Sequence, residues 1–331
     1  MNILGIETSC DETAAAVVKD GKVILSNIVA SSLKEHVKYG GIIPEIASRR
    51  QVEFITIVVK EALLRAKLKK DNIQGIAVTA KPGLIGSLLV GVSFARALSY
   101  AMNKPLIEVD HIKAHLYANF LTQKNGTRTK IKRQPKLPAV GLVVSGGHSS
   151  IFYIEDFNRC QLLGQTRDDA AGEAFDKVAR ILNLGYPGGP IIDRLAKSGV
   201  NNEIHFPCAE LPDSADFSFS GVKTAVLYFS RNIKDKKNLP VNKIAYAFQD
   251  SIVSVLVNKC LMACKKKCVR TLLVGGGVAA NSELRKRLGE HAKREGIDVY
   301  FPELSLCLDN AAMIAGLGYH LLLKKKKQNR F

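Results

Sequence analysis

Two histidines four residues apart are the side chains of this sequence best suited to chemistry. His111 and His115 follow Asp110, a suitable N-cap, and the segment that continues to residue 121 contains no Gly or Pro, which predicts a helix. Side chains four apart lie on one helix face, and two neutral imidazoles there can bind a divalent metal ion. Two solvated polar residues are the alternative interpretation. The metal site is favoured because Asp309, at a second strand-to-helix junction, can supply a third ligand.

Length and composition indicate a globular protein of about two domains. The chain has 331 residues, of which 47% are hydrophobic and 24% are charged. The most apolar stretch, residues 84–98, contains Arg96, and the first residues follow a strand pattern rather than a secretory signal. The seven cysteines are odd in number and scattered, as expected of reduced thiols. We therefore expect a cytoplasmic protein with no membrane partner.

The net charge indicates a nucleic-acid partner. Lys and Arg number 48 against 30 Asp and Glu, and the resulting net charge of +18 would attract polyanions. The excess is concentrated in residues 123–138 and in the tail at 324–331. Both segments either contact nucleic-acid phosphates or are solvated charge runs with no such role.

The elements that must position the histidines follow an α/β plan that occurs twice, because short apolar runs alternate with amphipathic helical stretches. In the first half we expect strands at 3–7, 14–19, 23–30, 75–79 and 106–109. We expect one helix at 44–67, a second that follows the glycine turn at 83–86 and ends near 102, and a third that begins at 111. In the second half we expect strands at 140–144, 151–154, 271–274 and 299–301, with helices at 281–294 and from 309. The repeated order indicates an internal duplication with a cleft between the two halves.

This duplication predicts the domain organisation. We expect an N-terminal lobe at 1–122 with the first hairpin and the metal-binding helix, and a basic linker loop at 123–138. The C-terminal lobe would span 139–323 and carry the second hairpin and the third metal ligand. A basic tail would occupy 324–331.

Two polar hairpin turns, at 8–13 and 145–149, occupy matching places in the two halves. Turns rich in Ser, Thr and Gly can leave backbone N–H groups free to bind phosphate oxygens. A glycine-rich junction at 275–281 would let a nucleobase or ribose approach the backbone closely. A single hairpin of this kind more often only reverses the chain. Two at matching positions favour a nucleotide cleft between the lobes.

Three other motifs resemble known binding or catalytic signatures but lack a residue or spacing that each signature requires. Residues 275–280 match the dinucleotide pattern G-x-G-x-x-A but lie late in the chain, and the acid that should follow is too distant. Residues 221–224 look like the end of a P-loop whose leading Gly is replaced by Asp216. A zinc protease needs Glu directly after the first histidine, and Ile112 occupies that place.

With these motifs in order, the chain resembles the TsaD (Gcp/YgjD) family of tRNA N6-adenosine threonylcarbamoyltransferases. The resemblance covers nearly the whole length. It rests on residues 6–13, 110–115, 143–148, 168–177, 186–190, 217–224, 276–281 and 307–310.

The resemblance implies a duplicated actin/Hsp70/sugar-kinase-like (ASKHA) fold, with two lobes around a nucleotide cleft. It also implies one divalent metal ion, iron(II) in preference to zinc, on His111, His115 and Asp309. The implied substrate contacts are Val143, Val144, Ser145, Gly146, Gly147, Asp176, Gly189, Asp193 and Asn281. Asp169, Glu173 and Asp176 are spaced to share a helix face, where Asp176 could bind ribose hydroxyls. Asn281 could either cap a helix or contact the ligand.

The implied reaction is acyl transfer from threonylcarbamoyl-AMP to the N6 amine of the tRNA adenosine 3′ of the anticodon, in tRNAs that read A-starting codons. An exocyclic amine is a poor nucleophile, so a carboxylate that takes its proton is plausible. Asp11 and Glu12 are the catalytic candidates, although both could instead organise the turn or bound water. The resemblance also implies bacterial companion proteins, the inactive paralogue TsaB and the ATPase TsaE. Alternatives are an ASKHA-fold small-molecule kinase, a metallo-endopeptidase and a nucleotide-switched tRNA-binding scaffold.

Overall fold

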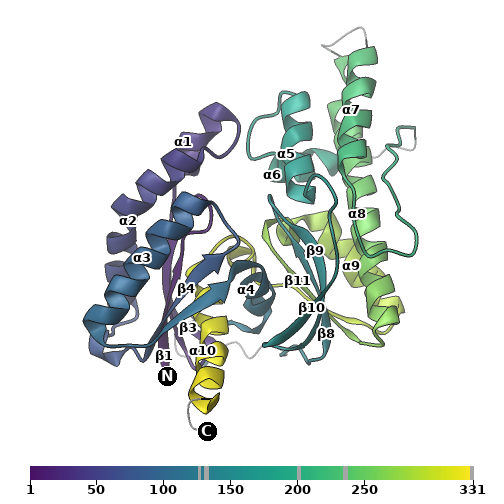
Figure 1. Cartoon of the computed structure of the whole chain (residues 1–331). Helices are drawn as coiled ribbons and strands as arrows, with labels where there is room; N and C mark the ends of the chain where they lie inside the picture. Colours follow the sequence, from purple (N-terminus) through teal and green to yellow (C-terminus); the bar gives the residue numbers. More distant parts are fainter. Residues whose placement is uncertain (126–127, 130–133, 200–202, 234–237, 329–331) are drawn as a thin grey trace. The chain divides into compact units, whose positions relative to one another are not determined.

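The computed structural model describes the chain except for residues 126–127, 130–133, 200–202, 234–237 and 329–331 (Figure 1). The chain divides into two compact units. Unit 1 comprises Met1–Pro135 and Pro302–Phe331, and unit 2 comprises Lys136–Phe301. Each unit is built around one sheet covered by helices.

Unit 1 contains a seven-stranded sheet in the order β5-β4-β1-β2-β3-β6-β7. Strand β1 pairs antiparallel with β2 and parallel with β4, and β2 pairs antiparallel with β3. The strands are β1 (Asn2–Glu7), β2 (Glu12–Lys19), β3 (Val23–Ser31), β4 (Gly75–Lys81), β5 (Leu106–Asp110), β6 (Thr122–Asn125) and β7 (Arg128–Thr129). The helices are α1 (Leu33–His36), α2 (Pro44–Arg65), α3 (Ile85–Met102), α4 (His111–Tyr117) and α10 (Ala311–Gln328).

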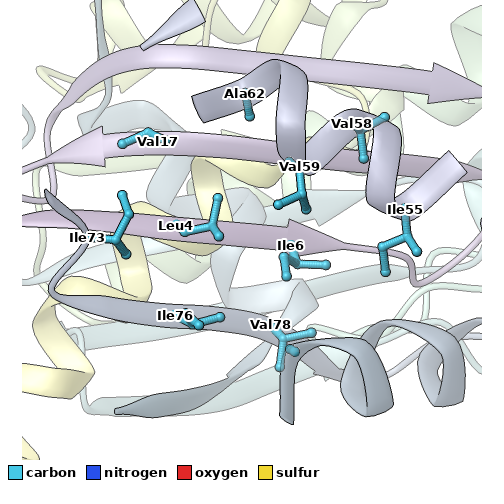
Figure 2. Packing of buried hydrophobic residues seen from close by; sticks show 12 residues of the cluster. Leu4, Ile6, Val17, Ile55, Val58, Val59, Ala62, Ile73, Ile76 and Val78 are labelled. Atoms are coloured by element: carbon cyan, nitrogen blue, oxygen red, sulfur yellow. The ribbon is translucent and has the colours of Figure 1, made fainter. Parts of the chain in front are cut away.

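The two faces of strand β1 are buried against different helices, because successive side chains of a strand point to opposite faces. Leu4 and Ile6 point toward α2, where they join an apolar cluster that also contains strand residues of β2 and β4 (Figure 2). From α2, Ile55, Val58, Val59 and Ala62 complete this cluster. Burial on both faces explains why β1 reads as a nearly continuous apolar run.

The opposite face of the sheet receives helix α10 at very close range. A Cβ atom added at Gly5 of β1 would lie 2.8 Å from Ala315 N and still closer to Ala311 O. On α10 itself, a Cβ at Gly316 would lie 2.5 Å from the Tyr117 ring of α4, and one at Gly318 would lie 2.5 Å from Ala77 of β4. Glycine at these positions therefore lets the helix backbone contact β1, β4 and α4 directly.

Unit 2 repeats the strand order of unit 1. Its sheet runs β10-β9-β8-β11-β12, which matches β3-β2-β1-β4-β5, with the same parallel and antiparallel pairings. The strands are β8 (Ala139–Val144), β9 (Ser149–Asp156), β10 (Arg159–Gln165), β11 (Thr271–Gly275) and β12 (Asp298–Tyr300). The helices are α5 (Ala171–Ile181), α6 (Gly188–Ala196), α7 (Ser220–Asn232), α8 (Val241–Lys266) and α9 (Ser282–Arg294). The duplication read from the sequence is therefore confirmed.

Two expectations differ from the structure. We placed residues 302–323 in the C-terminal lobe, but Pro302–Phe331 groups with unit 1 because α10 packs on that unit's sheet. The expected linker at 123–138 is divided as well: β6 extends the sheet of unit 1 beside β3, and part of the segment lies outside the described residues. Strand β10 was not predicted, since its alternation is weak and it lies half exposed.

Two of the described helices, α3 and α8, are long and apolar enough to cross a membrane by length and composition alone. The apolar window of α8 is 78% buried, as is typical of a core helix, whereas that of α3 is 17% buried. Helices α2 and α3 lie side by side in unit 1 (Figure 1). Together they leave large apolar side chains exposed, which are Val52, Ile57, Leu64, Ile85, Leu89 and Tyr100.

We expect Gly5→Ala to destabilise the protein by about 1–3 kcal/mol, because the added methyl group meets backbone atoms of α10 that cannot move aside. Urea unfolding measures the effect. Gly289→Ala is the control: it lies within α9 with nothing within 4 Å of the new Cβ, and should stabilise by up to about 1 kcal/mol. Equal stability of Gly5→Ala and wild type would contradict the close packing.

Candidate active site

The two histidines lie at the start of α4, as predicted. Asp110 caps this helix, because its side chain accepts a hydrogen bond from Lys113 N at 3.1 Å. His111 and His115 are therefore adjacent on one face, with ring centroids 4.6 Å apart. Their exposed fractions are 7% and 1%, so neither is the solvated polar residue of the alternative interpretation.

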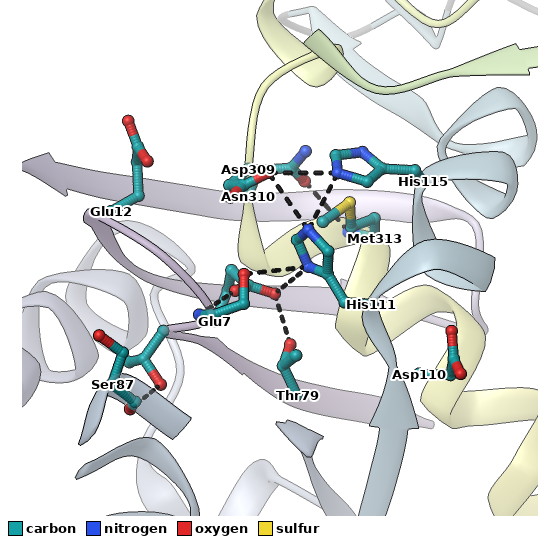
Figure 3. A network of polar contacts seen from close by, with 12 residues as sticks. Glu7, Glu12, Thr79, Ser87, Asp110, His111, His115, Asp309, Asn310 and Met313 are labelled. Carbon is teal, nitrogen blue, oxygen red and sulfur yellow. Dashed lines mark hydrogen bonds and ion pairs between the residues drawn. The ribbon is translucent and has the colours of Figure 1, made fainter. Parts of the chain in front are cut away.

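Asp309 joins the histidines from the segment before α10 (Figure 3). Its Oδ1 lies 3.1 Å from His115 Nε2 and 3.5 Å from His111 Nε2, and the two Nε2 atoms are 3.2 Å apart. The next residue, Asn310, fixes this turn: its amide donates to Leu308 O and its Oδ1 caps α10 at Met313 N. One atom from each of the three side chains thus converges on a point, with all three within 4.8 Å of one another.

The charges around His111 favour a cation. Burial by itself lowers the pKa of His111, but the carboxylates of Glu7 and Asp309 outweigh it and raise the pKa to about 9. Two imidazole nitrogens and one carboxylate oxygen all have lone pairs that can be directed at one cation. A divalent metal ion satisfies all three, and two His with one carboxylate is a donor set that leaves positions open for other ligands. The residues present therefore fit a divalent metal ion.

The first hairpin holds Asp11 and Glu12 in the same unit. Its backbone is tied to two helices: Gln51 of α2 donates to Cys10 O at 2.8 Å, and Ser87 of α3 donates to the same oxygen at 3.2 Å. Asp11 is buried and Glu12 is half-buried. Burial, and then the neighbouring carboxylates of Asp11 and Asp309, raise the pKa of Glu12 to about 9. Both candidate bases therefore lie in a region of concentrated negative charge that includes Asp309.

Glu7 was part of the first motif, but we gave it no role. It is the last residue of β1 and is fully buried, with Oε2 3.1 Å from His111 Nδ1 (Figure 3). The signal that could have found it is an acidic residue closing an otherwise apolar strand, which is costly unless the carboxylate has a partner.

In unit 2, the second hairpin continues from β8. Val143 and Val144 have fully buried side chains, so only their backbone could contact a ligand. Ser145 is held in place because its carbonyl accepts a hydrogen bond from Gly172 N of α5 at 3.1 Å. Gly146 and Gly147 are exposed, and a Cβ at either would meet nothing within 4 Å. The turn thus offers open backbone at these two glycines.

The other substrate candidates lie on helices of unit 2 or at their starts. Asp176 of α5 accepts a hydrogen bond from Gly188 N at 2.7 Å, and burial raises the pKa of Asp176 despite the backbone N–H groups of Gly188 and Gly189. Asp193 of α6 accepts from the Ser282 hydroxyl at 2.8 Å. These contacts tie the start of α6 to α5, and α6 itself to the start of α9.

Asn281 is the N-cap of α9, since its Oδ1 accepts from Leu284 N at 2.9 Å. Its amide nitrogen donates to Gln249 Oε1 of α8 at 2.8 Å, a buried partner that we did not predict. Capping is therefore observed, and one amide hydrogen remains for another acceptor. Asp169 was expected to share a helix face with Glu173 and Asp176. It instead precedes α5 and pairs with Lys177 and Lys223, both on helices, at 2.7 and 2.8 Å.

The class of protein follows from the fold. Among solved structures, HypF of T. kodakarensis matches 98% of this chain and 48% of its own, with a TM-score of 0.63 and 14% identity. Component A of the Acidaminococcus fermentans (R)-2-hydroxyglutaryl-CoA dehydratase matches 98% of this chain and 99% of its own, with a TM-score of 0.56 and 15% identity. Such identities show the fold alone. The chain has the duplicated ASKHA fold.

The family follows from the sequence. The family model described as TsaD: tRNA N6-adenosine threonylcarbamoyltransferase matches residues 23–316. The protein of that name from Syntrophus aciditrophicus is 50% identical over 329 residues, which are 99% of this chain and 94% of the relative. The one from Clostridioides difficile is 49% identical over 325 residues, covering 98% and 94%. This chain belongs to the TsaD family.

We expect His111→Ala to abolish tight binding of a divalent metal ion, because it removes one of the three converging ligands found among the described residues. The measurement is titration of the chelator-stripped protein with Zn²⁺ or Co²⁺ against a chromophoric competitor. His205→Ala, at an exposed histidine of unit 2, should bind the metal as wild type does. A His111→Ala protein that binds one ion with unchanged affinity would exclude this site.

Proposed function

We propose that this chain transfers the threonylcarbamoyl group from threonylcarbamoyl-AMP to N6 of the adenosine 3′ of the anticodon, in tRNAs that read A-starting codons. The observation that carries this proposal is membership of the TsaD family over nearly the full chain, with 50% sequence identity to a transferase of that name. The enzyme is a tRNA-modifying acyltransferase.

His111, His115 and Asp309 would hold one divalent metal ion, and the two-histidine, one-carboxylate donor set favours iron(II), with zinc as the alternative. Bound there, the ion would supply Lewis acidity and a template for the substrate. The three metal ligands are held in place by helix caps, because Asp110 and Asn310 fix the two turns from which the ligand side chains project.

The adenylate would be bound by residues of unit 2. The open backbone at Gly146 and Gly147, beside Ser145, suits the phosphate, since backbone N–H groups in such turns bind anions. Val143 and Val144 would contribute through their backbone only. Asp176 is positioned by Gly188 N to accept hydrogen bonds from ribose hydroxyls, with Gly189 beside it. Asp193 and Asn281, held by Ser282 and Gln249, would complete the nucleoside contacts.

Asp11 and Glu12 would take the proton that the N6 amine loses as it attacks the carbamoyl carbon. AMP leaves as the new bond to nitrogen forms. The raised pKa of Glu12 has Asp309 among its causes, and a cation bound to Asp309 would offset that contribution and bring the pKa closer to neutrality. A general base works best when its pKa lies near the operating pH.

The partners follow from the reaction and the family. The substrate is tRNA, and the net charge of +18 supports its binding. The lysines at 324–327 are exposed on the last turns of α10, and we propose that they contact tRNA phosphates. The same role for the segment 123–138 falls partly outside the described residues.

We further propose that the companion proteins TsaB and TsaE act with this chain in the cytoplasm. The exposed apolar side chains of α2 and α3 support docking of the inactive paralogue on this part of unit 1, because such a surface is unfavourable in water. No comparison favours a small-molecule kinase or a scaffold. The endopeptidase alternative still lacks the glutamate that Ile112 replaces.

We expect threonylcarbamoyl-adenosine to form when the metal-loaded protein, its companions, threonylcarbamoyl-AMP and unmodified tRNA are combined. Nucleoside mass spectrometry measures the product. Asp309→Ala should abolish it by removing a metal ligand, and His205→Ala should leave it unchanged. If no product forms with every component present, the kinase and scaffold alternatives are favoured, and an assay of nucleotide turnover distinguishes between them.

Asp11→Asn and Glu12→Gln should each slow single-turnover transfer by about 10²–10⁴-fold if that residue is the general base, with adenylate and tRNA binding retained. Glu53→Gln is the matched control, because this acid is exposed on α2 and pairs only with a surface arginine, Arg50, among the interactions described. Full transfer rates in both hairpin variants would assign these carboxylates to the turn rather than to the chemistry.

A further inference from the structure

Glu7 is a fully buried carboxylate for which the proposed reaction has no direct use. Its Oε1 accepts a hydrogen bond from Ser9 N at 2.5 Å, and its Oε2 accepts one from the Thr79 hydroxyl of β4. The same Oε2 lies 3.1 Å from His111 Nδ1. A buried charge is tolerated only when it is paired and hydrogen-bonded, and Glu7 meets that condition through these three groups.

The two nitrogens of the His111 ring face different partners (Figure 3). Nδ1 faces Glu7 Oε2 at 3.1 Å and the Ser9 hydroxyl at 3.2 Å, and Nε2 faces His115 and Asp309. The 3.1 Å separation allows a hydrogen on Nδ1 to be donated to Glu7 Oε2, with the Ser9 hydroxyl beside it, and the neutral ring then presents the lone pair of Nε2 to the other two ligands. His115 has no such partner: its Nδ1 is buried without a hydrogen-bond partner among the described groups.

We propose that Glu7 is a positioning residue for the metal centre. Its carboxylate holds His111 in the tautomer and ring orientation that direct Nε2 at the metal ion, and it strengthens Nε2 as a ligand. The inference rests on the proposed metal ion at His111, His115 and Asp309. Partners of this kind, beyond the ligands themselves, typically change metal affinity by 10–100-fold.

Charge supports the same role. The carboxyl groups of Glu7 and Asp309 lie at the two nitrogens of the His111 ring, 3.1 Å from Nδ1 and 3.5 Å from Nε2, so Glu7 adds to the attraction of Asp309 for a cation. A neutral side chain at position 7 would lose this contribution to the attraction of a cation. The alternative is that Glu7 only joins the ends of β1 and β4 through Thr79, in which case metal affinity would not depend on it.

The test is the dissociation constant for Zn²⁺, by competition with a chromophoric chelator, in chelator-stripped Glu7→Gln protein. Glutamine keeps the size of the side chain and its carbonyl can still face Nδ1, but the charge is lost. We expect the dissociation constant to rise about 10–100-fold. Glu108→Gln is the control, because it removes one exposed carboxylate from β5 of the same unit and should leave metal affinity unchanged. Circular dichroism and thermal unfolding of the metal-free proteins establish that each variant is folded.

Unchanged metal affinity in folded Glu7→Gln would overturn the inference. If His111→Ala also binds Zn²⁺ as wild type does, the proposed metal site itself fails, so the two failures are distinguishable. A second measurement needs no variant: ring ¹⁵N spectra of the Zn²⁺-loaded wild-type protein should show His111 protonated at Nδ1 and bound through Nε2. A hydrogen on Nε2 of His111 would contradict the inference even if Glu7→Gln did not fold.

Discussion

The close approach of α10 to the sheet of unit 1 is the constraint on which the candidate site depends. Gly5 lets the start of this helix reach β1, and Gly316 lets its middle reach Tyr117 on the histidine helix. A methyl group at Gly5 would collide with backbone atoms of the helix, and one at Gly316 with the Tyr117 ring, so neither could be accommodated without moving the helix. Since Asp309 immediately precedes α10, the position of the helix fixes the third ligand relative to the first two.

The same packing also brings several carboxyl groups together near the candidate metal site. The end of β1, the first hairpin and the start of α10 bring Glu7, Asp11, Glu12 and Asp309 into one region. Burial and then the neighbouring carboxylates raise the pKa of Glu12, and Glu7 and Asp309 raise the pKa of His111 against the effect of burial. Carboxylates gathered in a buried region repel one another unless a cation compensates them. A site so arranged is therefore suited to a divalent ion, and the ion would in turn stabilise the fold around it.

The duplicated sheet serves different chemistry in the two units. Both hairpins connect the first two antiparallel strands of a sheet in the same order. In unit 1 the turn carries acids, and its Cys10 carbonyl is tied to α2 and α3 through Gln51 and Ser87. In unit 2 the turn carries Gly146 and Gly147 with free space around them. The two units therefore share the same strand order but differ in their hairpin turns, one of which carries acidic side chains and the other exposed glycine backbone.

Features that depend on near neighbours in the chain could be predicted from the sequence. Helix period placed His111 beside His115, N-cap preferences marked Asp110 and Asn281, and the order of apolar runs indicated the duplicated sheet. The family was predicted from the resemblance of the motifs. Three features emerge only from the folded chain: Asp309 belongs to unit 1, Glu7 faces His111 although 104 positions separate them in sequence, and Gln249 holds Asn281. These contacts arise from helices and strands packing at particular heights and angles. The spacing of residues along the chain does not predict that packing, because the packing depends on side chains that are distant in sequence.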